Sequence, residues 1–185
     1  FDYDFQKGQK TGYISATNFY PLWTGIPSEE KAQRMVNNLM RHLKAKGGIL
    51  ASAKSSVEET ATNEVQRQWD YPYGWAPHQM LLWQGLLHYG YEKEAYELIY
   101  RWLWMITKNA VDYNGTIPEK YDVVKATHKV YAEYGNVGTE FDYITKSGFG
   151  WMNASYQFGL ELLPQEYVQK LDELVPPQQI FGNRN

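Results

Sequence analysis

The segment QWDYPYGWAP, from Gln68 to Pro77, is the most informative part of this chain of 185 residues. It places aromatic rings, one carboxylate and two prolines directly before a predicted helix. A pyranose sugar packs its apolar face on Trp or Tyr and bonds its hydroxyls to carboxylates and amides, so this composition is typical of a carbohydrate site. The alternative is a rigid turn whose tryptophans belong to the core, because aromatic clusters are more often buried than exposed in a cleft.

The sequence downstream of this segment is helical. Pro77 suits the first turn of a helix that continues to Gly90, and a second helix follows almost at once. The apolar positions of the two helices are Met80, Trp83 and Leu87, then Ala95, Ile99, Trp102 and Ile106. Because the connection between them is so short, the two helices are predicted to form a hairpin.

The clearest helix signals lie upstream, in the segment that begins at Ser28. Ser28 suits the N-cap, Glu29 and Glu30 fall in the first turn, and Gly47 lies beyond the end. The apolar residues recur at helical spacing: Ala32, Met35, Val36, Leu39, Met40 and Leu43. Further helices are predicted over 15–23, 150–163 and 166–175. The periodicity therefore predicts an all-α array of three helical hairpins.

Two connections in the chain are unusually long. They run from Gly47 to Ala76 and from Ala110 to Ser147, well beyond the roughly 15 residues that a structureless loop usually has in a compact domain. Both are rich in aromatic residues, whereas disordered linkers are poor in them. We therefore expect both loops to fold over a ligand.

Three segments, in order along the chain, resemble signature segments of the α,α-trehalases, a family of inverting glycoside hydrolases. They are QWDYPYGWAP at 68–77, PEKYDV at 118–123 and GFGWMNAS at 148–155. The resemblance covers nearly the whole chain and implies an all-α fold that is part, about half, of an (α/α)6 toroid built from helical hairpins. It also implies that residues 1–185 are the C-terminal portion of a single glycoside hydrolase catalytic domain, closest in loop pattern to the neutral trehalases.

The resemblance implies hydrolysis of α,α-trehalose to two glucose molecules, with Glu119 as the general base. Inverting glycosidases use two carboxyl groups about 6.5–9.5 Å apart, so that a water molecule fits beside the sugar. Pro118 restricts the backbone ahead of Glu119 and gives the carboxylate a stiff support. The family's general-acid Asp lies in a Trp-Asp-x-Tyr segment upstream of everything in this chain. We therefore expect the N-terminal remainder of the catalytic domain to be a partner, and this chain to be inactive by itself.

The resemblance also implies which residues bind the sugar. The Gln-Trp-Asp residues of the first segment orient a glucose, which gives Asp70 a binding role. Glu133 is expected to be the carboxylate of a loop that closes over the substrate, and Glu140 is its rival because this loop departs from the family's glycine-rich pattern. The expected substrate-binding residues are Gln68, Trp69, Asp70, Glu133, Glu140, Phe149 and Trp151.

Composition argues against other classes of partner. A net charge of −3 and a pI near 5.8 provide no cationic surface for nucleic acid. The most apolar stretch, 98–106, is interrupted by Arg101, so no membrane span is predicted. The histidines lack metal-ligand spacing and no glycine-rich phosphate loop occurs, so neither a metal nor a cofactor is expected. The absence of cysteine and of a leader sequence favours a cytoplasmic location.

Two alternatives stay open at the level of sequence. One is another helical-toroid glycosidase that acts on α-glucan chains, which a comparison of trehalose with maltose and kojibiose would distinguish. The other is a non-catalytic carbohydrate-binding or regulatory fragment, because half a toroid exposes an apolar seam that can dock to another chain.

Overall fold

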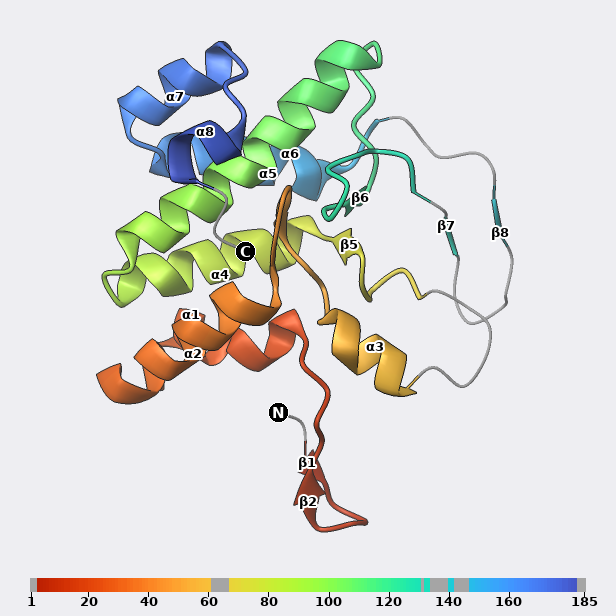
Figure 1. Cartoon of the computed structure of the whole chain (residues 1–185), viewed down its shortest axis with the longest axis vertical. Coiled ribbons are helices and arrows are strands. Elements are labelled where there is room, and N and C mark those ends of the chain that lie inside the picture. The colour runs from red at the N-terminus through yellow and green to blue at the C-terminus, as the bar shows by residue number, and fades with distance from the viewer. Residues whose placement is uncertain (1–2, 61–66, 131, 134–139, 142–146, 183–185) are drawn as a thin grey trace.

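The computed structural model describes residues 3–60, 67–130, 132–133, 140–141 and 147–182, and it is dominated by helices (Figure 1). The helices are η1 (Ala16–Phe19), α1 (Pro21–Thr24), α2 (Glu29–His42), α3 (Lys54–Thr60), α4 (Ala76–His88), α5 (Glu92–Asp112), α6 (Gly150–Leu162), α7 (Gln165–Asp172) and α8 (Pro177–Phe181). The strands are β1 (Tyr3–Asp4), β2 (Gln9–Lys10), β3 (Lys44–Ala45), β4 (Gly48–Ile49), β5 (Tyr73–Gly74), β6 (Tyr121–Asp122), β7 (Ala132–Glu133) and β8 (Glu140–Phe141). The predicted all-α class is confirmed, because each strand has two residues and pairs with one antiparallel neighbour.

Helix α2 follows its sequence signals at the start and departs from them at the end. Ser28 is the N-cap with extended backbone angles, and the apolar stripe buries Ala32, Val36 and Leu39. The helix ends at His42, several residues before Gly47, because the chain turns into the β3–β4 hairpin, in which Ala45 pairs with Gly48. Local pairing of four residues therefore replaces the last predicted turn.

Helix α4 is the centre of the array and contacts α1, α5 and α6. Its start matches the prediction, with Trp75 as N-cap and a proline in the first turn. Gly85 permits the contact with α1, since a Cβ atom built there would lie 2.8 Å from the Leu22 Cβ and 2.8 Å from the Trp23 backbone nitrogen. Two helices with side chains at this crossing could not approach so closely.

Helix α5 is almost completely buried from Leu98 to Ile106. Arg101, which interrupts this apolar stretch, donates to Glu97 Oε1 from Nε at 2.9 Å and from Nη2 at 2.7 Å. Lys44 of β3 donates to the same oxygen at 3.2 Å. The buried guanidinium is thus compensated within one turn of its own helix and by the hairpin that follows α2.

Two helices were not predicted from the sequence. Helix α3 lies inside the connection that the sequence predicts to be a loop, and α8 lies in the last ten residues. The segment KSSVEET of α3 carries Val57 as its one apolar residue, so it has no amphipathic periodicity to detect. Helix α8 contacts α5, and the Ser56 hydroxyl of α3 accepts a hydrogen bond from the Ile14 nitrogen at 2.8 Å.

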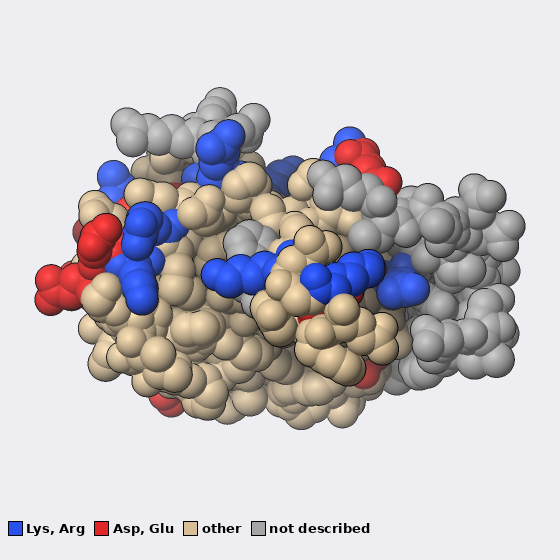
Figure 2. Space-filling model, turned by 90° about the horizontal axis from the view of Figure 1, so that it is seen from below, with Lys and Arg blue, Asp and Glu red and all other residues tan. Residues whose placement is uncertain are grey.

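The strands β5 to β8 gather on one side of the helices, at the right in Figure 1, so the loops that carry the resemblance lie together. On the face that Figure 2 shows, Lys and Arg occur in small groups separated by uncharged residues. None of the helices in the described part of the chain is both long and apolar enough to cross a membrane.

Candidate functional site

The loop before α4 is held in place by backbone hydrogen bonds from three directions. Within it, the Tyr73 nitrogen donates to the Asp70 oxygen at 2.9 Å and closes a turn. The Ala51 nitrogen donates to the Tyr73 oxygen at 2.8 Å, and Val123 donates to Pro72 at 3.1 Å. Residues distant in sequence therefore fix the backbone from which the candidate sugar-binding side chains project.

Three tryptophans from two segments meet beside this loop. The indoles of Trp69 and Trp75 stack with centroids 3.8 Å apart and planes 8° apart. Trp151, in the first turn of α6, stands perpendicular to both, at 6.4 Å from Trp69 and 5.8 Å from Trp75. Trp75 is 1% exposed, whereas Trp69 is 43% and Trp151 36% exposed. The core interpretation therefore applies to Trp75, and the two exposed rings remain available to a ligand.

Gln68 and Lys120 join the tryptophan cluster to the segment that contains Glu119. The Gln68 backbone oxygen accepts a hydrogen bond from Trp75 Nε1 at 2.7 Å. Its side-chain oxygen accepts one from Lys120 Nζ at 3.4 Å. The same ammonium lies 5.3 Å from the Trp75 ring centroid, a cation–π contact. Lys120 is 3% exposed and serves as the internal link between the two segments.

Asp70 is oriented by Tyr13, which lies 57 residues earlier in the chain. The Tyr13 hydroxyl donates a hydrogen bond to Asp70 Oδ1. Burial, followed by this hydrogen bond, raises the pKa of Tyr13 to about 12, so the phenol keeps its proton at neutral pH. Asp70 is half-buried, and a carboxylate with one oxygen engaged retains a second acceptor for a sugar hydroxyl.

Glu119 lies at the edge of the β5–β6 pair. Gly74 pairs with Tyr121, and continuing this antiparallel register leads toward Trp75 and the start of α4. The neighbours Pro118 and Lys120 are buried, whereas Glu119 is half-exposed. Its carboxylate has no hydrogen bond or ion pair with any residue that the structure describes. The carboxylate is thus held on a fixed backbone and is free to accept a proton.

A histidine and a tyrosine lie behind the exposed face of the cluster. His78, in the first turn of α4, shares a 2.7 Å hydrogen bond between its Nδ1 and the Tyr20 hydroxyl. Its ring lies 5.5 Å from the Trp69 ring with planes 81° apart. Burial lowers the pKa of His78 to about 4, so the imidazole is neutral at neutral pH.

The remaining residues expected to bind substrate lie on two further segments. Phe149 is the N-cap of α6 and packs half-buried against the core, two residues before Trp151. Glu133 and Glu140 are directly opposite each other in the β7–β8 ladder, but their side chains lie outside what the structure describes. The two rival carboxylates therefore share one hairpin, and which of them contacts the substrate stays a prediction.

The two glycines around Phe149 do not act by close packing. A Cβ atom at Gly148 or Gly150 would have no neighbour within 4 Å among the described residues outside the local chain. Gly148 instead has a φ of 101°, a backbone conformation that other residues rarely adopt. No neighbour in the described part of the chain therefore requires a glycine at Gly150.

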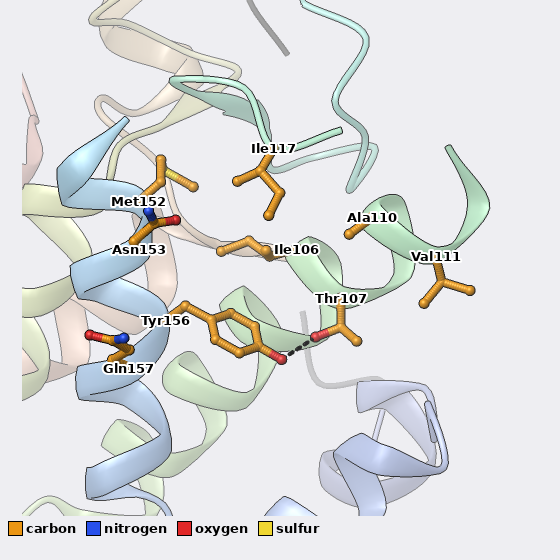
Figure 3. A pocket seen from close by; sticks show the side chains of 9 residues that line it. All are labelled: Ile106, Thr107, Ala110, Val111, Ile117, Met152, Asn153, Tyr156 and Gln157. Carbon is orange, nitrogen blue, oxygen red and sulfur yellow. Dashed lines mark hydrogen bonds between the residues drawn. The ribbon is translucent and has the colours of Figure 1, made fainter. Parts of the chain in front are cut away.

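A pocket of about 480 Å³ lies between α5 and α6 (Figure 3). Its wall is mainly aliphatic, with Ile106 and Val111 from α5 and Met152 from α6. Ile117, two residues before Glu119, closes one side. The hydroxyls of Thr107 and Tyr156 share a 2.7 Å hydrogen bond across it. None of the residues expected to bind substrate lines this pocket, so we do not assign the sugar to it.

Four residues of the candidate site were not singled out from the sequence. Lys120 lies within the segment 118–123 and His78 directly follows the segment 68–77, so their position in the sequence was a usable signal. Tyr13 and Tyr20 gave no local signal, since their hydrogen bonds span 57 and 58 residues. Such partners become visible only after the chain has folded.

The chain matches known proteins over almost its whole length. The family model described as Trehalase matches residues 1–164. The cytosolic neutral trehalase of Kluyveromyces lactis is 46% identical over 184 residues, which are 98% of this chain and 24% of that protein. The cytosolic neutral trehalase of Saccharomyces cerevisiae is 45% identical over 185 residues, 99% of this chain and 25% of that protein. The chain thus spans about a quarter of the length of these curated relatives.

A solved structure agrees with the sequence matches. Neutral trehalase Nth1 from Saccharomyces cerevisiae superposes with a TM-score of 0.82 at 39% identity, over 100% of this chain and 30% of that one. The helices described above therefore form part of the trehalase (α/α)6 toroid. With a family model over most of its length and a matching fold, this chain belongs to the trehalase family.

Proposed function

We propose that this chain is the C-terminal portion of a single inverting trehalase catalytic domain, in which it supplies the general base and one wall of the sugar site. The observation that supports this most directly is the meeting of three separate segments. Trp69 and Asp70 lie before α4, Trp151 begins α6, and Lys120 connects the Glu119 segment to the first of these. Exposed rings, carboxylates and an amide are the groups that recognise a pyranose.

Glu119 acts on water in this proposal. Its carboxylate takes a proton from a water molecule, whose oxygen attacks one anomeric carbon of trehalose from the face opposite the bridging oxygen. The bond from that carbon to the bridging oxygen breaks as the general acid protonates the departing glucose. Because only the attacked carbon inverts, one molecule of trehalose gives one β-glucose and one α-glucose.

The general acid comes from outside this chain. We assign it to an Asp in the upstream Trp-Asp-x-Tyr segment of the domain, whose N-terminal remainder is the structural partner of these helices. Trp69, Trp151 and Phe149 form an aromatic wall, Gln68 and Asp70 bond sugar hydroxyls, and the β7–β8 hairpin brings Glu133 or Glu140 to the substrate. The relatives are named cytosolic trehalases, which supports a cytoplasmic location.

Product analysis tests this function against the two alternatives. The complete catalytic domain that contains this chain is incubated with trehalose, maltose and kojibiose, and the initial anomers are followed by NMR. We expect turnover of trehalose alone, with equal amounts of α- and β-glucose at early times. Two α-glucose molecules from trehalose would indicate retention. Cleavage of maltose in preference would favour an α-glucan glycosidase, and binding without turnover would favour a carbohydrate-binding or regulatory role.

A further inference from the structure

We infer that His78, fastened by the Tyr20 hydroxyl, is a positioning residue that holds the Trp69 indole in the orientation in which it contacts the sugar. This inference rests on the proposed function and assigns a role to two residues outside the segments that carry the family resemblance. It is supported by the ring contacts of Trp69, by the burial and hydrogen bond of His78, and by the position of His78 and Tyr20 at the contact between α1 and α4.

The orientation of Trp69 is set by ring packing. Its indole makes no hydrogen bond with any residue that the structure describes, and 43% of the residue is exposed. It stacks on Trp75 at 3.8 Å, which fixes the plane of the ring. A stack alone lets two rings slide and turn against each other, so contacts at the ring edges are needed to fix the remaining freedom. His78 and Trp151 supply perpendicular contacts of this kind.

His78 is the more rigid of these two perpendicular partners. It is 7% exposed and belongs to the first turn of α4, the helix at the centre of the array, whereas Trp151 is 36% exposed. The 2.7 Å hydrogen bond between the Tyr20 hydroxyl and Nδ1 fixes which way the imidazole faces. Tyr20 belongs to neither signature loop, because it lies between η1 and α1. The His78–Tyr20 pair therefore couples the packing of α1 against α4 to the orientation of the exposed Trp69 indole.

The chain provides a matched control at the other end of α4. Tyr89 is half-buried like Tyr20, and its hydroxyl donates to the Pro27 oxygen at 2.6 Å. Its ring contacts His88 at 4.9 Å, with planes 81° apart. Tyr89→Phe deletes a tyrosine hydrogen bond of the same kind, but Tyr89 has no ring contact with the tryptophan cluster in the described residues.

The test compares Tyr20→Phe with Tyr89→Phe in the complete catalytic domain. A residue that orients a binding surface for ground and transition state alike changes KM and leaves kcat almost unaltered. We expect Tyr20→Phe to raise KM for trehalose about threefold to tenfold, the range that one hydrogen bond supports, with kcat within about twofold of wild type. Tyr89→Phe should lower Tm by about as much as Tyr20→Phe does, because each variant loses one tyrosine hydrogen bond. It should leave KM unchanged.

A second pair of variants separates positioning from general stability. His78→Phe keeps a ring edge against Trp69 but loses the hydrogen bond, so it should match Tyr20→Phe, and the double variant should be no worse than either single one. Calorimetric binding of trehalose to the same variants in a Glu119→Gln background should show the same factor in Kd. An unchanged KM in Tyr20→Phe with a Tm loss like that of Tyr89→Phe would overturn the inference. Failure of the wild-type domain to cleave trehalose would instead overturn the proposed function.

Discussion

At each end of helix α4 a histidine contacts a tyrosine, but the two pairs lie in different surroundings. At the first end, the buried His78 bonds Tyr20 and contacts Trp69. At the last end, the exposed His88 contacts Tyr89, whose hydroxyl bonds a backbone oxygen. The first end adjoins the exposed Trp69 and Trp151 and the segment with Glu119. The comparison shows that a histidine and a tyrosine indicate a site through what surrounds them, and not through their presence alone.

The largest effect should come from replacing the carboxylate of Glu119, in the segment next to the first end of α4. Glu119→Gln keeps the size and polarity of the side chain but cannot accept a proton from water. We expect kcat for trehalose to fall on the order of 10² to 10⁴, with KM and Tm nearly unchanged, in steady-state glucose release and thermal unfolding. Glu161→Gln, at an exposed position of α6, is the control and should retain wild-type turnover. Near-normal kcat in Glu119→Gln would show that Glu119 is not the general base.

The next effect is the part of the pH dependence of stability that comes from His78. Its pKa is about 4 in the folded protein, against an ordinary value of 6.5. Below pH 6.5 the unfolded chain therefore binds a proton that the folded protein does not. The free energy of unfolding should fall as the pH drops from 6.5 to about 4, on the order of 3 kcal/mol in total, and His78 should contribute no further loss below that.

Urea unfolding of the complete domain at several pH values measures this dependence. His78→Gln should lose that part of the decline, so the difference from wild type should shrink with falling pH. Gly85→Ala removes no titrating group and should keep the wild-type decline. A constant difference between His78→Gln and wild type from pH 7 to pH 4 would show that the imidazole is not buried as described.

The contact between α1 and the middle of α4 gives a smaller effect on stability. Gly85→Ala brings a Cβ atom to 2.8 Å from the Trp23 nitrogen, and backbone cannot move aside as a flexible side chain can. We expect a loss of about 1–3 kcal/mol in the free energy of unfolding by urea titration. At Gly12 a Cβ atom would meet nothing within 4 Å among the described residues, so Gly12→Ala should stay within about 0.5 kcal/mol of wild type. Equal stability of both variants would refute the close approach of the helices.

The smallest effect distinguishes two tryptophans of similar exposure. Trp69 is 43% exposed beside the candidate site, and Trp23 is 46% exposed on α1. Trp69→Ala should raise KM for trehalose by about tenfold, because a stacking surface for the sugar is lost. Trp23→Ala should leave KM unchanged. An equal effect of both substitutions in steady-state kinetics would mean that Trp69 is not a sugar-binding surface.

Much of the fold was predictable from sequence because helix signals are local. The N-cap at Ser28 and the proline in the first turn of α4 are both confirmed. Helix α2 ends at His42, next to the last predicted apolar position Leu43, because Ala45 pairs with Gly48. Helix α3 was missed because its sequence has no apolar periodicity.

The candidate site was predictable in its segments and not in its supports. The resemblance of short segments to the trehalase signatures identified Trp69, Asp70 and Trp151 as candidates. The structure places the ring centroids of the two tryptophans 6.4 Å apart. Tyr13 and Tyr20 bond residues 57 and 58 positions further along the chain, and no spacing rule connects them to the site. Short segments therefore identify the groups that meet a substrate, and only the fold identifies the groups that hold them.

The most direct test of the central claim is glucose release from trehalose by this chain, by a separately made upstream half that contains the Trp-Asp-x-Tyr segment, and by their mixture. We expect release in the mixture and in neither half alone, because the base and the acid lie on different halves. Release by this chain alone would contradict the account, since it would place both catalytic groups within these 185 residues. A mixture that associates and binds trehalose but releases no glucose would contradict it as well.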